Sequence, residues 1–416
     1  MDAIPREAAP DSTLALARDP YGFIADRCRR HGSDAFEARI MLQRTICLTG
    51  HDAAALFYDP ERFMRAGAAP GRLEKALFGR GGVQGLDGEA HRNRKRMLMS
   101  LMTPERLGAL GEIAEECWRR YARQWQTRDS VVLYDQVQRL LCEAVCRWAG
   151  VPLADPEVES RSAELTALFE QAGAVGPKYW WGRLARRRAE RWAGDVIAGV
   201  RAGRLHPPEH SAAHVIAGHR DPDGALLRPP VAAVELLNVL RPAVAVAVFV
   251  TFAAVALHQY PAARRGLQAD AHGYLDLFVQ EVRRFYPFFP AVAARVRRDF
   301  EWRGYRFPAR RRVLLDLYGT NHDGRVWENP DAFLPERFMR WDEGPYNFIP
   351  QGGGDHYLGH RCAGEWGTLE LMRVAVRFLS EELAFRVPEQ DLSIDRSRLP
   401  ALPRSRVVLE TIRMLR

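Results

Sequence analysis

The sequence lacks the cysteine pattern that builds a disulfide framework. Its 416 residues include only six cysteines, and their spacings show no such framework, whereas disulfide-stapled secreted domains are short and densely bridged. We therefore predict a reducing, cytoplasmic setting. Cys142 and Cys146 lie at helical spacing and are predicted to be core thiols. The six are Cys28, Cys47, Cys117, Cys142, Cys146 and Cys362.

Long apolar runs are also missing. The longest uncharged apolar stretch extends from Pro242 to Leu257, which is shorter than the roughly 20 residues that a membrane-spanning helix needs. We predict a buried core helix at this place and no membrane span. The first residues, Met1-Asp-Ala-Ile-Pro-Arg6, contain no apolar signal segment.

Repeats, low-complexity segments and linkers rich in proline, glycine or serine are absent, so nothing divides the chain. We expect a single domain spanning residues 1–416. Basic residues outnumber acidic ones by 60 to 52, a net charge of +8, but no nucleic-acid-binding module accompanies the arginine clusters. We predict solvated helix faces, no nucleic-acid partner and a modest attraction for anionic substrates.

Helical periodicity dominates the sequence. Strand-like stretches are short and few, so helices are expected to form the core and strands its periphery. The predicted fold class is mainly α with small peripheral β-sheets. The expected helices are 103–125, 135–149, 157–172, 181–202, 231–258, 273–286 and 365–379, and the expected strands are 37–48, 300–307, 313–317 and 406–412.

Cys362 ends a glycine-rich loop, and a helical pattern begins directly after it. The loop reads Phe348-Ile-Pro-Gln-Gly-Gly-Gly-Asp-His-Tyr-Leu-Gly-His-Arg-Cys-Ala-Gly364. Backbone amides of such a loop can donate to a thiolate, and the positive end of the helix stabilises its charge. This arrangement suits a thiolate ligand of haem iron. Taken alone, the loop also allows a structural cysteine, or a zinc site formed by His356, His360 and Cys362.

Two further motifs make the pattern more specific. Glu281 and Arg284 lie three residues apart, on one helix face, and Arg337 follows within Trp327-Glu-Asn-Pro-Asp-Ala-Phe-Leu-Pro-Glu-Arg-Phe338. In this order before the cysteine loop, the motifs resemble the cytochrome P450 superfamily over the whole chain. The resemblance implies a haem b, ligated by the Cys362 thiolate, between a long distal helix and the proximal helix that follows the loop. It also implies that Glu281, Arg284 and Arg337 form a buried structural network.

The resemblance further implies basic partners for the haem propionates. His91 and Lys95, one helical turn apart, suit this role, and His360 and Arg65 are expected to join them. The loop departs from the superfamily pattern at Asp355, because a phenylalanine is usual seven residues before the cysteine. That departure concerns the fine geometry around the ligand rather than the ligand itself.

The helix expected above the haem lacks the acid–alcohol pair that relays protons in most members of the superfamily. Residues 234–245 read Val-Glu-Leu-Leu-Asn-Val-Leu-Arg-Pro-Ala-Val-Ala. A buried Arg241 needs an anionic partner, and an internal ion pair with Glu235 is one alternative. Pro242 frees the carbonyl of Asn238, so we expect a kink there.

Arg241-Pro242, the loop from Gln351 to Cys362, and Gly82-Val-Gln-Gly-Leu-Asp-Gly88 together resemble the fatty-acid peroxygenase branch. Its members use hydrogen peroxide and need no redox partner. The resemblance implies that a fatty-acid carboxylate pairs with Arg241 and moves the proton that O–O cleavage requires. A carboxylate held there brings only the first methylenes close to the iron, so we predict hydroxylation at the α or β carbon.

Gln84 bears on the reaction outcome. Relatives with histidine at this position tend to decarboxylate the acid to an alkene, whereas glutamine is typical of hydroxylating members. Pro242, Phe78 and Phe289 are expected to bind the substrate, with Phe288 beside them, and Phe78 to tune α against β. A fatty-acid decarboxylase, a reductase-dependent monooxygenase, and a non-catalytic haem sensor or fatty-acid carrier are the alternatives.

Overall fold

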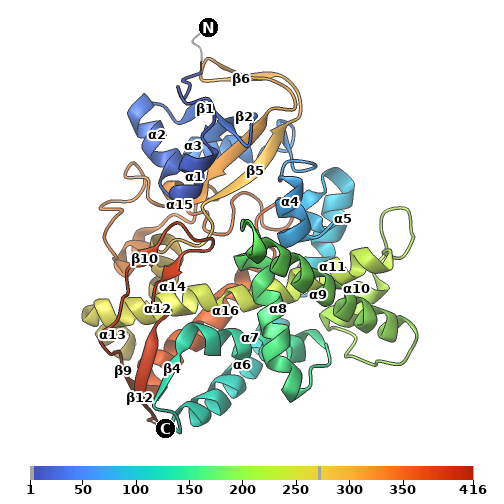
Figure 1. Ribbon diagram of the computed structural model, residues 1–416, viewed down its shortest axis with the longest axis vertical. Coiled ribbons are helices and arrows are strands. Elements are labelled where there is room, and N and C mark those ends of the chain that lie inside the picture. Colours follow the sequence, from blue (N-terminus) through green and yellow to red (C-terminus); the bar gives the residue numbers. More distant parts are fainter. Residues whose placement is uncertain (1–3, 270–272, 416) are drawn as a thin grey trace.

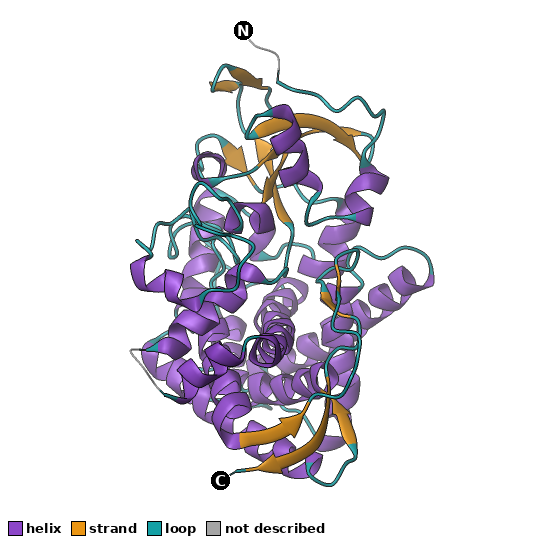
Figure 2. Cartoon of the chain, turned by 90° about the vertical axis from the view of Figure 1, so that its left-hand side faces the viewer, coloured by secondary structure: helices purple, strands orange, loops and turns teal. Residues whose placement is uncertain are grey.

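The computed structural model describes residues 4–269 and 273–415. Helices make up most of it, and the largest sheet lies at the opposite end from the helical core (Figure 1). A smaller sheet lies beside the C-terminal end of the described chain, below the helices in Figure 2. The predicted fold class, mainly α with small peripheral sheets, is confirmed.

Nine helices of the described residues contain 12 residues or more; eight of them carry the core, and the ninth is α5 with 12 residues. Thr103 caps α6, because its side chain accepts a hydrogen bond from the amide of Arg106 at 3.3 Å and Pro104 occupies the first helical position. The core helices are α6 (Pro104–Trp125), α7 (Leu133–Ala149), α8 (Val158–Glu170), α9 (Pro177–Arg201), α11 (Pro229–Ala245), α12 (Ala247–Gln259), α14 (Tyr274–Phe285) and α16 (Glu365–Arg377).

The remaining helices connect these elements. The α-helices are α1 (Thr13–Arg18), α2 (Phe23–His31), α3 (His51–Phe57), α4 (Gly71–Leu73), α5 (Gly88–Met99), α10 (Ala212–Gly218), α13 (Pro261–Gln268) and α15 (Leu317–Asn321). Three short segments are 3₁₀ helices: η2 (Val83–Gly85), η3 (Asp155–Glu157) and η4 (Pro335–Arg340). Two are π-helices: η1 (Glu74–Phe78) and η5 (Phe378–Glu382).

The strands form one mixed sheet and three small antiparallel ones. The five-stranded sheet has the order β1-β2-β8-β5-β3, with β2 and β8 parallel, and β4-β12-β9 forms the three-stranded sheet. The strands are β1 (Ala35–Ile40), β2 (Gln43–Leu48), β3 (Phe63–Met64), β4 (Ser130–Val132), β5 (Ala291–Val296), β6 (Phe300–Trp302), β7 (Tyr305–Phe307), β8 (Arg312–Asp316), β9 (Leu383–Arg386), β10 (Ile394–Asp395), β11 (Leu402–Pro403) and β12 (Val408–Met414).

Two segments predicted as single strands are hairpins. Met41 and Leu42 have φ angles of 54° and 61° and form the turn between β1 and β2, and Arg303 and Gly304, at 49° and 78°, do the same between β6 and β7. Two-residue turns with positive φ match the twist of the strands they join. The prediction of one continuous strand was wrong in both places because neither Met41-Leu42 nor Arg303-Gly304 is a strong turn sequence.

The apolar helix predicted over 231–258 forms two helices, α11 and α12, that continue one another across the helical core (Figure 1). The kink expected at Pro242 stays a prediction; the chain is helical through Pro242, and the helix is interrupted at Val246. There the amide of Val246 donates to Ala243, three residues back, at 3.2 Å. The helix therefore tightens one turn after the proline, which removes only its own hydrogen bond.

This pair of helices is the centre of the core. By length and composition Pro229–Gln259 could span a membrane, but 83% of its apolar window is buried inside the protein. α11 packs against α7, α8 and α9, and α12 packs against α7, α14 and α16. The prediction of a buried core helix is confirmed.

Candidate functional site

The Cys362 loop folds tightly between the strand-rich part and α16. Gly352 and Gly354 have φ angles of 93° and 83°, which side chains with a Cβ rarely adopt. A Cβ at Gly353 would lie 2.7 Å from the carbonyl oxygen of Pro345. The amide of Cys362 donates to the carbonyl of Gln351 at 3.1 Å. Cys362 is only partly buried as a residue, whereas the other five cysteines are buried.

Polar groups surround the sulfur of Cys362. The Gln351 amide points at it, with Nε2 3.8 Å from Sγ, and also donates to the hydroxyl of Thr368 at 3.0 Å. Burial raises the pKa of the Cys362 thiol, Glu365 adds to this, and Lys95 opposes it. A bound metal cation reverses this balance and favours the thiolate.

A second layer of charge fixes Gln351. Arg283, which is buried, donates to Oε1 of Gln351 at 3.0 Å and pairs with Glu365 at the start of α16. Arg361 pairs with the same carboxylate at 2.6 Å. Burial would raise the pKa of Glu365, but Arg283 and Arg361 lower it to about 2. Glu365 is thus an anion, and it orients the guanidinium groups of Arg283 and Arg361 beside the cysteine.

Four basic side chains gather beside the loop, as predicted for propionate partners. The rings of His91 and His360 lie 3.8 Å apart, centroid to centroid. Burial lowers the pKa of His91 to about 3 and that of Lys95 to about 8. Lys95 donates to the carbonyl oxygen of Arg361. His91 and Lys95 come from α5 and His360 from the loop itself, so the structure brings these two motifs together, and Arg65 is the fourth member.

Arg65 completes this basic cluster. Burial lowers its pKa to about 10, and its Nη1 is buried without a hydrogen-bond partner among residues 4–269 and 273–415. Asp87 fixes the backbone, accepting hydrogen bonds from the amides of Arg65 and Ala66 at 2.9 Å, and lies 3.8 Å from His360. A cluster of basic groups with an unpaired guanidinium nitrogen fits the two carboxylates of a haem.

The three residues expected to form a charge network are in contact. Arg284 holds Glu281 through two hydrogen bonds of 2.7 and 2.8 Å, and Arg337 approaches the same carboxylate at 3.3 Å. Both Glu281 and Arg284 are fully buried. Arg284 also donates to three backbone carbonyls, which ties α14 to the segment before the cysteine loop. They are those of Asn321, Pro330 and Ala332.

Arg241 is a buried cation without a carboxylate partner. Its exposed fraction is 5%, and within the described part of the chain no acidic oxygen lies within 4.0 Å of it. Its Nη1 donates to the carbonyl of Leu77. Burial and the neighbouring Arg186 together lower the pKa of Arg241 to about 9, although Cys362 and Glu235 oppose them.

The alternative ion pair between Arg241 and Glu235 does not form. Glu235 pairs instead with Arg94, at 2.6 Å, and accepts a hydrogen bond from the amide of Val83 at 2.8 Å. Glu235 therefore ties α11 to α5 and to the segment that carries Gln84. Arg241 remains available for an anion from outside the chain.

Gln84 lies in the same cluster. Asn238, one turn before Arg241 on α11, donates to Oε1 of Gln84 at 3.2 Å and lies 3.1 Å from Glu235. The Oδ1 of Asn238 is buried without a partner among the described residues. The amide of Gln84 is thus held at a fixed position relative to Arg241.

Phe78 ends η1, and arginines hold its backbone. Arg186 of α9, fully buried, lies 3.3 Å from the carbonyl of Leu77 and 3.4 Å from that of Phe78, and pairs with Glu190 at 2.7 Å. Arg183 donates to the carbonyl of Lys75 at 2.9 Å. The backbone at the half-buried Phe78 is therefore held in place. It lies beside Arg241, because Arg241 donates to the carbonyl of the preceding residue, Leu77.

Phe288 and Phe289 lie between α14 and β5. Their rings are 4.7 Å apart, centroid to centroid, and that of Phe288 is 4.4 Å from Phe249 of α12. The roles of Phe289 and Pro242 in substrate binding stay predictions.

Several residues of the site do not stand out as functional in the sequence. Asn238 could have been found, because it is a second polar residue one turn from Arg241 in an apolar helix. Arg283 precedes Arg284 directly and carries the same charge, so nothing in the sequence distinguished their separate partners. Arg186 and Gln351 are recognised only through contacts with segments distant in sequence.

The zinc alternative has no support in the geometry. Among the described residues, no three His, Cys, Asp or Glu side chains lie close enough to hold a metal ion. The ring of His356 instead stacks on Trp366, with centroids 4.3 Å apart.

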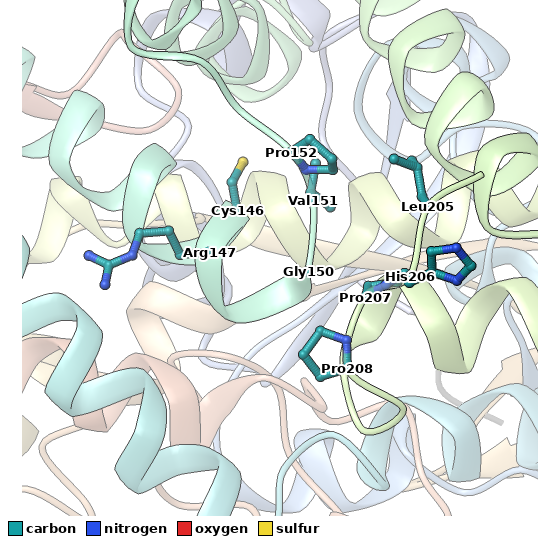
Figure 3. Close-up of a pocket in the computed structure, with 9 residues that line it drawn as sticks. All are labelled: Cys146, Arg147, Gly150, Val151, Pro152, Leu205, His206, Pro207 and Pro208. Carbon is teal, nitrogen blue, oxygen red and sulfur yellow. The ribbon is translucent and has the colours of Figure 1, made fainter. Parts of the chain in front are cut away.

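A pocket elsewhere contains none of the predicted site residues. It lies between the C-terminal end of α7 and the segment after α9 (Figure 3). Cys146 lines it, and a hydrogen bond to Cys142, together with burial, raises the pKa of its thiol. This supports the prediction that both are core thiols. The lining residues are Cys146, Arg147, Gly150, Val151, Pro152, Leu205, His206, Pro207 and Pro208.

Comparisons with known proteins show which families and structures this chain is similar to. The sequence model of the cytochrome P450 family matches residues 270–387. The structure of cytochrome P450SP alpha (CYP152B1) in complex with (R)-ibuprofen is 54% identical, with a TM-score of 0.96 over 98% of this chain and 100% of that one. Cytochrome P450EX alpha (CYP152N1) with myristic acid is 47% identical, with a TM-score of 0.96 over 100% of both chains. Ligand-free cytochrome P450 OleT is 32% identical, with a TM-score of 0.97 over 99% of both.

Curated sequences match over shorter stretches. Cytochrome P450 3A11 of Mus musculus is 28% identical over 144 residues, which are 33% of this chain and 28% of that protein. The matched part therefore spans less than a third of that relative.

Proposed function

This chain belongs to the cytochrome P450 family, and on that premise we propose that it is a fatty-acid peroxygenase that hydroxylates medium- and long-chain acids at the α or β carbon. One haem-thiolate domain over residues 1–416 is part of the proposal. The observation that carries it is Arg241, a buried guanidinium that no carboxylate of the described chain neutralises. The relative P450EX alpha was solved with myristic acid, an apolar chain with one carboxylate.

Haem, bound through the thiolate of Cys362, supplies the iron that activates hydrogen peroxide and oxidises C–H bonds. Gln351 donates a hydrogen bond to the sulfur, and Arg65, His91, Lys95 and His360 hold the propionates. The network of Glu281, Arg284 and Arg337 takes no part in the reaction. It holds the loop in place because Arg284 binds backbone carbonyls of the preceding segment.

Arg241 binds the substrate carboxylate. The guanidinium fork matches a carboxylate with two parallel hydrogen bonds, and a pKa of about 9 leaves Arg241 charged at neutral pH. A paired carboxylate offsets the cost of burying this cation. Held at this point, the carboxylate can take a proton from one peroxide oxygen and give it to the other. The O–O bond then breaks, the oxygen that receives the proton leaves as water, and the remaining oxygen atom is the one inserted into the C–H bond of the substrate.

The position of the carboxylate decides which carbon reacts. Anchoring the head group limits the reacting methylenes to the α and β positions. Phe78, held by Arg186 through the backbone, limits the motion of these methylenes. Gln84 bears an amide, which donates a hydrogen bond but does not transfer a proton as an imidazole does. Hydroxylation is therefore the main reaction, and decarboxylation to an alkene is the alternative outcome at the same site.

The proposal includes no redox partner and a cytoplasmic location. Peroxide carries both the oxygen atom and the oxidising equivalents, so no reductase is needed. A reductase-dependent monooxygenase would need a proton relay in the distal helix, where α11 has Asn238 and Arg241 instead of an acid–alcohol pair.

The direct test is turnover by the haem-loaded enzyme with myristic acid and hydrogen peroxide alone. Mass spectrometry should detect 2- or 3-hydroxymyristic acid. Product that forms only with a reduced nicotinamide and a reductase would contradict the proposal.

A further inference from the structure

The start of α9 exposes large apolar side chains. Val175, Trp180, Trp181 and Leu184 have exposed fractions of 74%, 71%, 44% and 42%. Trp181 and Leu184 are three residues apart and Trp180 and Leu184 four, so the three share one helix face. The opposite face is buried through Gly182, Ala185, Arg186 and Ala189. We call the four exposed residues Val175, Trp180, Trp181 and Leu184 the α9 patch.

Basic side chains border the α9 patch along the same helix. Lys178 precedes the tryptophans, and Arg187, Arg188 and Arg191 follow Leu184; all four are exposed. The first acidic residue along α9, Glu190, is paired with the buried Arg186 at 2.7 Å. The exposed surface thus has an apolar centre and a positively charged border.

The α9 patch lies next to the element that carries Phe78. The guanidinium of Arg72 on α4 stacks over the ring of Tyr179, at 4.2 Å from its centroid, and Arg183 binds the carbonyl of Lys75. The elements α9 and η1 are in contact, and α9 lies near α4 in Figure 1. A surface that binds the α9 patch would therefore lie beside this side of the fatty-acid site.

We propose that the α9 patch docks on the surface of an anionic lipid bilayer, from which the fatty acid passes into the site. Tryptophan side chains favour the level of the lipid head groups, and arginines close to an anionic surface are attracted to it. A second copy of the chain is disfavoured, because two positively charged borders would face each other. The passage of the substrate rests on the proposed function, whereas docking does not.

The test uses the haem-loaded enzyme and vesicles without peroxide. Sedimentation with phosphatidylcholine vesicles, with and without phosphatidylglycerol, gives the partition coefficient. We expect binding to anionic vesicles that weakens with salt. The double variant Trp180→Ser and Trp181→Ser should lower the partition coefficient at least tenfold. The matched control is Met339→Ser, because Met339 is 62% exposed in another part of the surface, and it should bind as the wild type does.

Further measurements separate the possible outcomes. Unchanged absorption and circular dichroism spectra show that the variants are folded, and turnover of a short, water-soluble fatty acid should be the same in both. Changing Arg187, Arg188 and Arg191 to glutamine should remove the preference for anionic vesicles and keep residual binding. Equal partitioning of wild type and the Trp180/Trp181 double variant would overturn the proposal, as would a wild-type dimer that this variant abolishes. Vesicle binding without hydroxylation would contradict the proposed function but not the docking.

Discussion

Changing Arg241 to alanine removes a charge whose predicted partner is the substrate. Truncating one member of a buried, hydrogen-bonded charge pair costs about 2–5 kcal/mol. At about 1.4 kcal/mol per tenfold change, the dissociation constant for myristic acid should rise by a factor of roughly 30 to 4,000. Arg186 cannot replace Arg241, because its guanidinium lies against the carbonyls of Leu77 and Phe78 and pairs with Glu190. We therefore expect turnover of the free acid to be abolished.

The assay is a titration of the haem absorption band with myristic acid and with methyl myristate, in the absence of peroxide. The ester lacks the negative charge, so wild type and Arg241→Ala should bind it with similar affinity. The difference between the two ligands isolates the interaction of Arg241 with the carboxylate. Arg241→Lys should bind the acid with intermediate affinity, because lysine keeps the charge and loses the two-point geometry.

Protein stability provides an internal check. No carboxylate of the described chain pairs with Arg241, so removing the guanidinium should leave the free energy of unfolding of the ligand-free protein unchanged or raise it. A strong loss of stability would show that Arg241 serves the fold. The reasoning would be refuted if the alanine variant lost equal affinity for acid and ester.

Three further predictions follow from the same site. Arg241 loses its proton as pH rises through about 9. Binding of myristic acid should therefore weaken tenfold per pH unit above that value, while binding of the ester stays constant. Parallel pH curves for the acid and the ester would contradict this. Arg186→Gln should loosen the backbone of Phe78 and change the ratio of 2-hydroxy to 3-hydroxy product severalfold in gas chromatography, with an unchanged haem spectrum; an unaltered ratio would show that Arg186 only packs. Gln84→His places an imidazole beside the carboxylate and should increase terminal alkene severalfold among the products, whereas an unchanged alkene fraction would remove Gln84 from the control of the outcome.

Much of the proximal side could be predicted from the sequence, because its signals are local. Cys362, its glycines and the following helix are consecutive, and Glu281 and Arg284 share one helical turn. The distal side depends on contacts between distant segments. Glu235 meets Arg94, 141 residues away, so spacing could not show that this pair leaves Arg241 unpaired. Similarly, nothing in the local sequence indicates that Arg186 anchors the backbone of Phe78.

The helix interruption illustrates the same limit. Proline removes one hydrogen bond, and a local rule therefore placed the kink at Pro242. The packing of α11 and α12 against different neighbours acts on the whole helix, and the turn tightens at Val246 instead. Sequence rules identify the weakened segment but not the residue at which the helix is interrupted.

The origin of the oxygen atom tests the central claim most directly. Turnover of myristic acid with ¹⁸O-labelled hydrogen peroxide, under ordinary air and without any reductase, should give hydroxymyristic acid with ¹⁸O in the new hydroxyl group. Hydroxy acid that contains oxygen only from air, and forms only when a reductase and a reduced nicotinamide are supplied, would contradict the account.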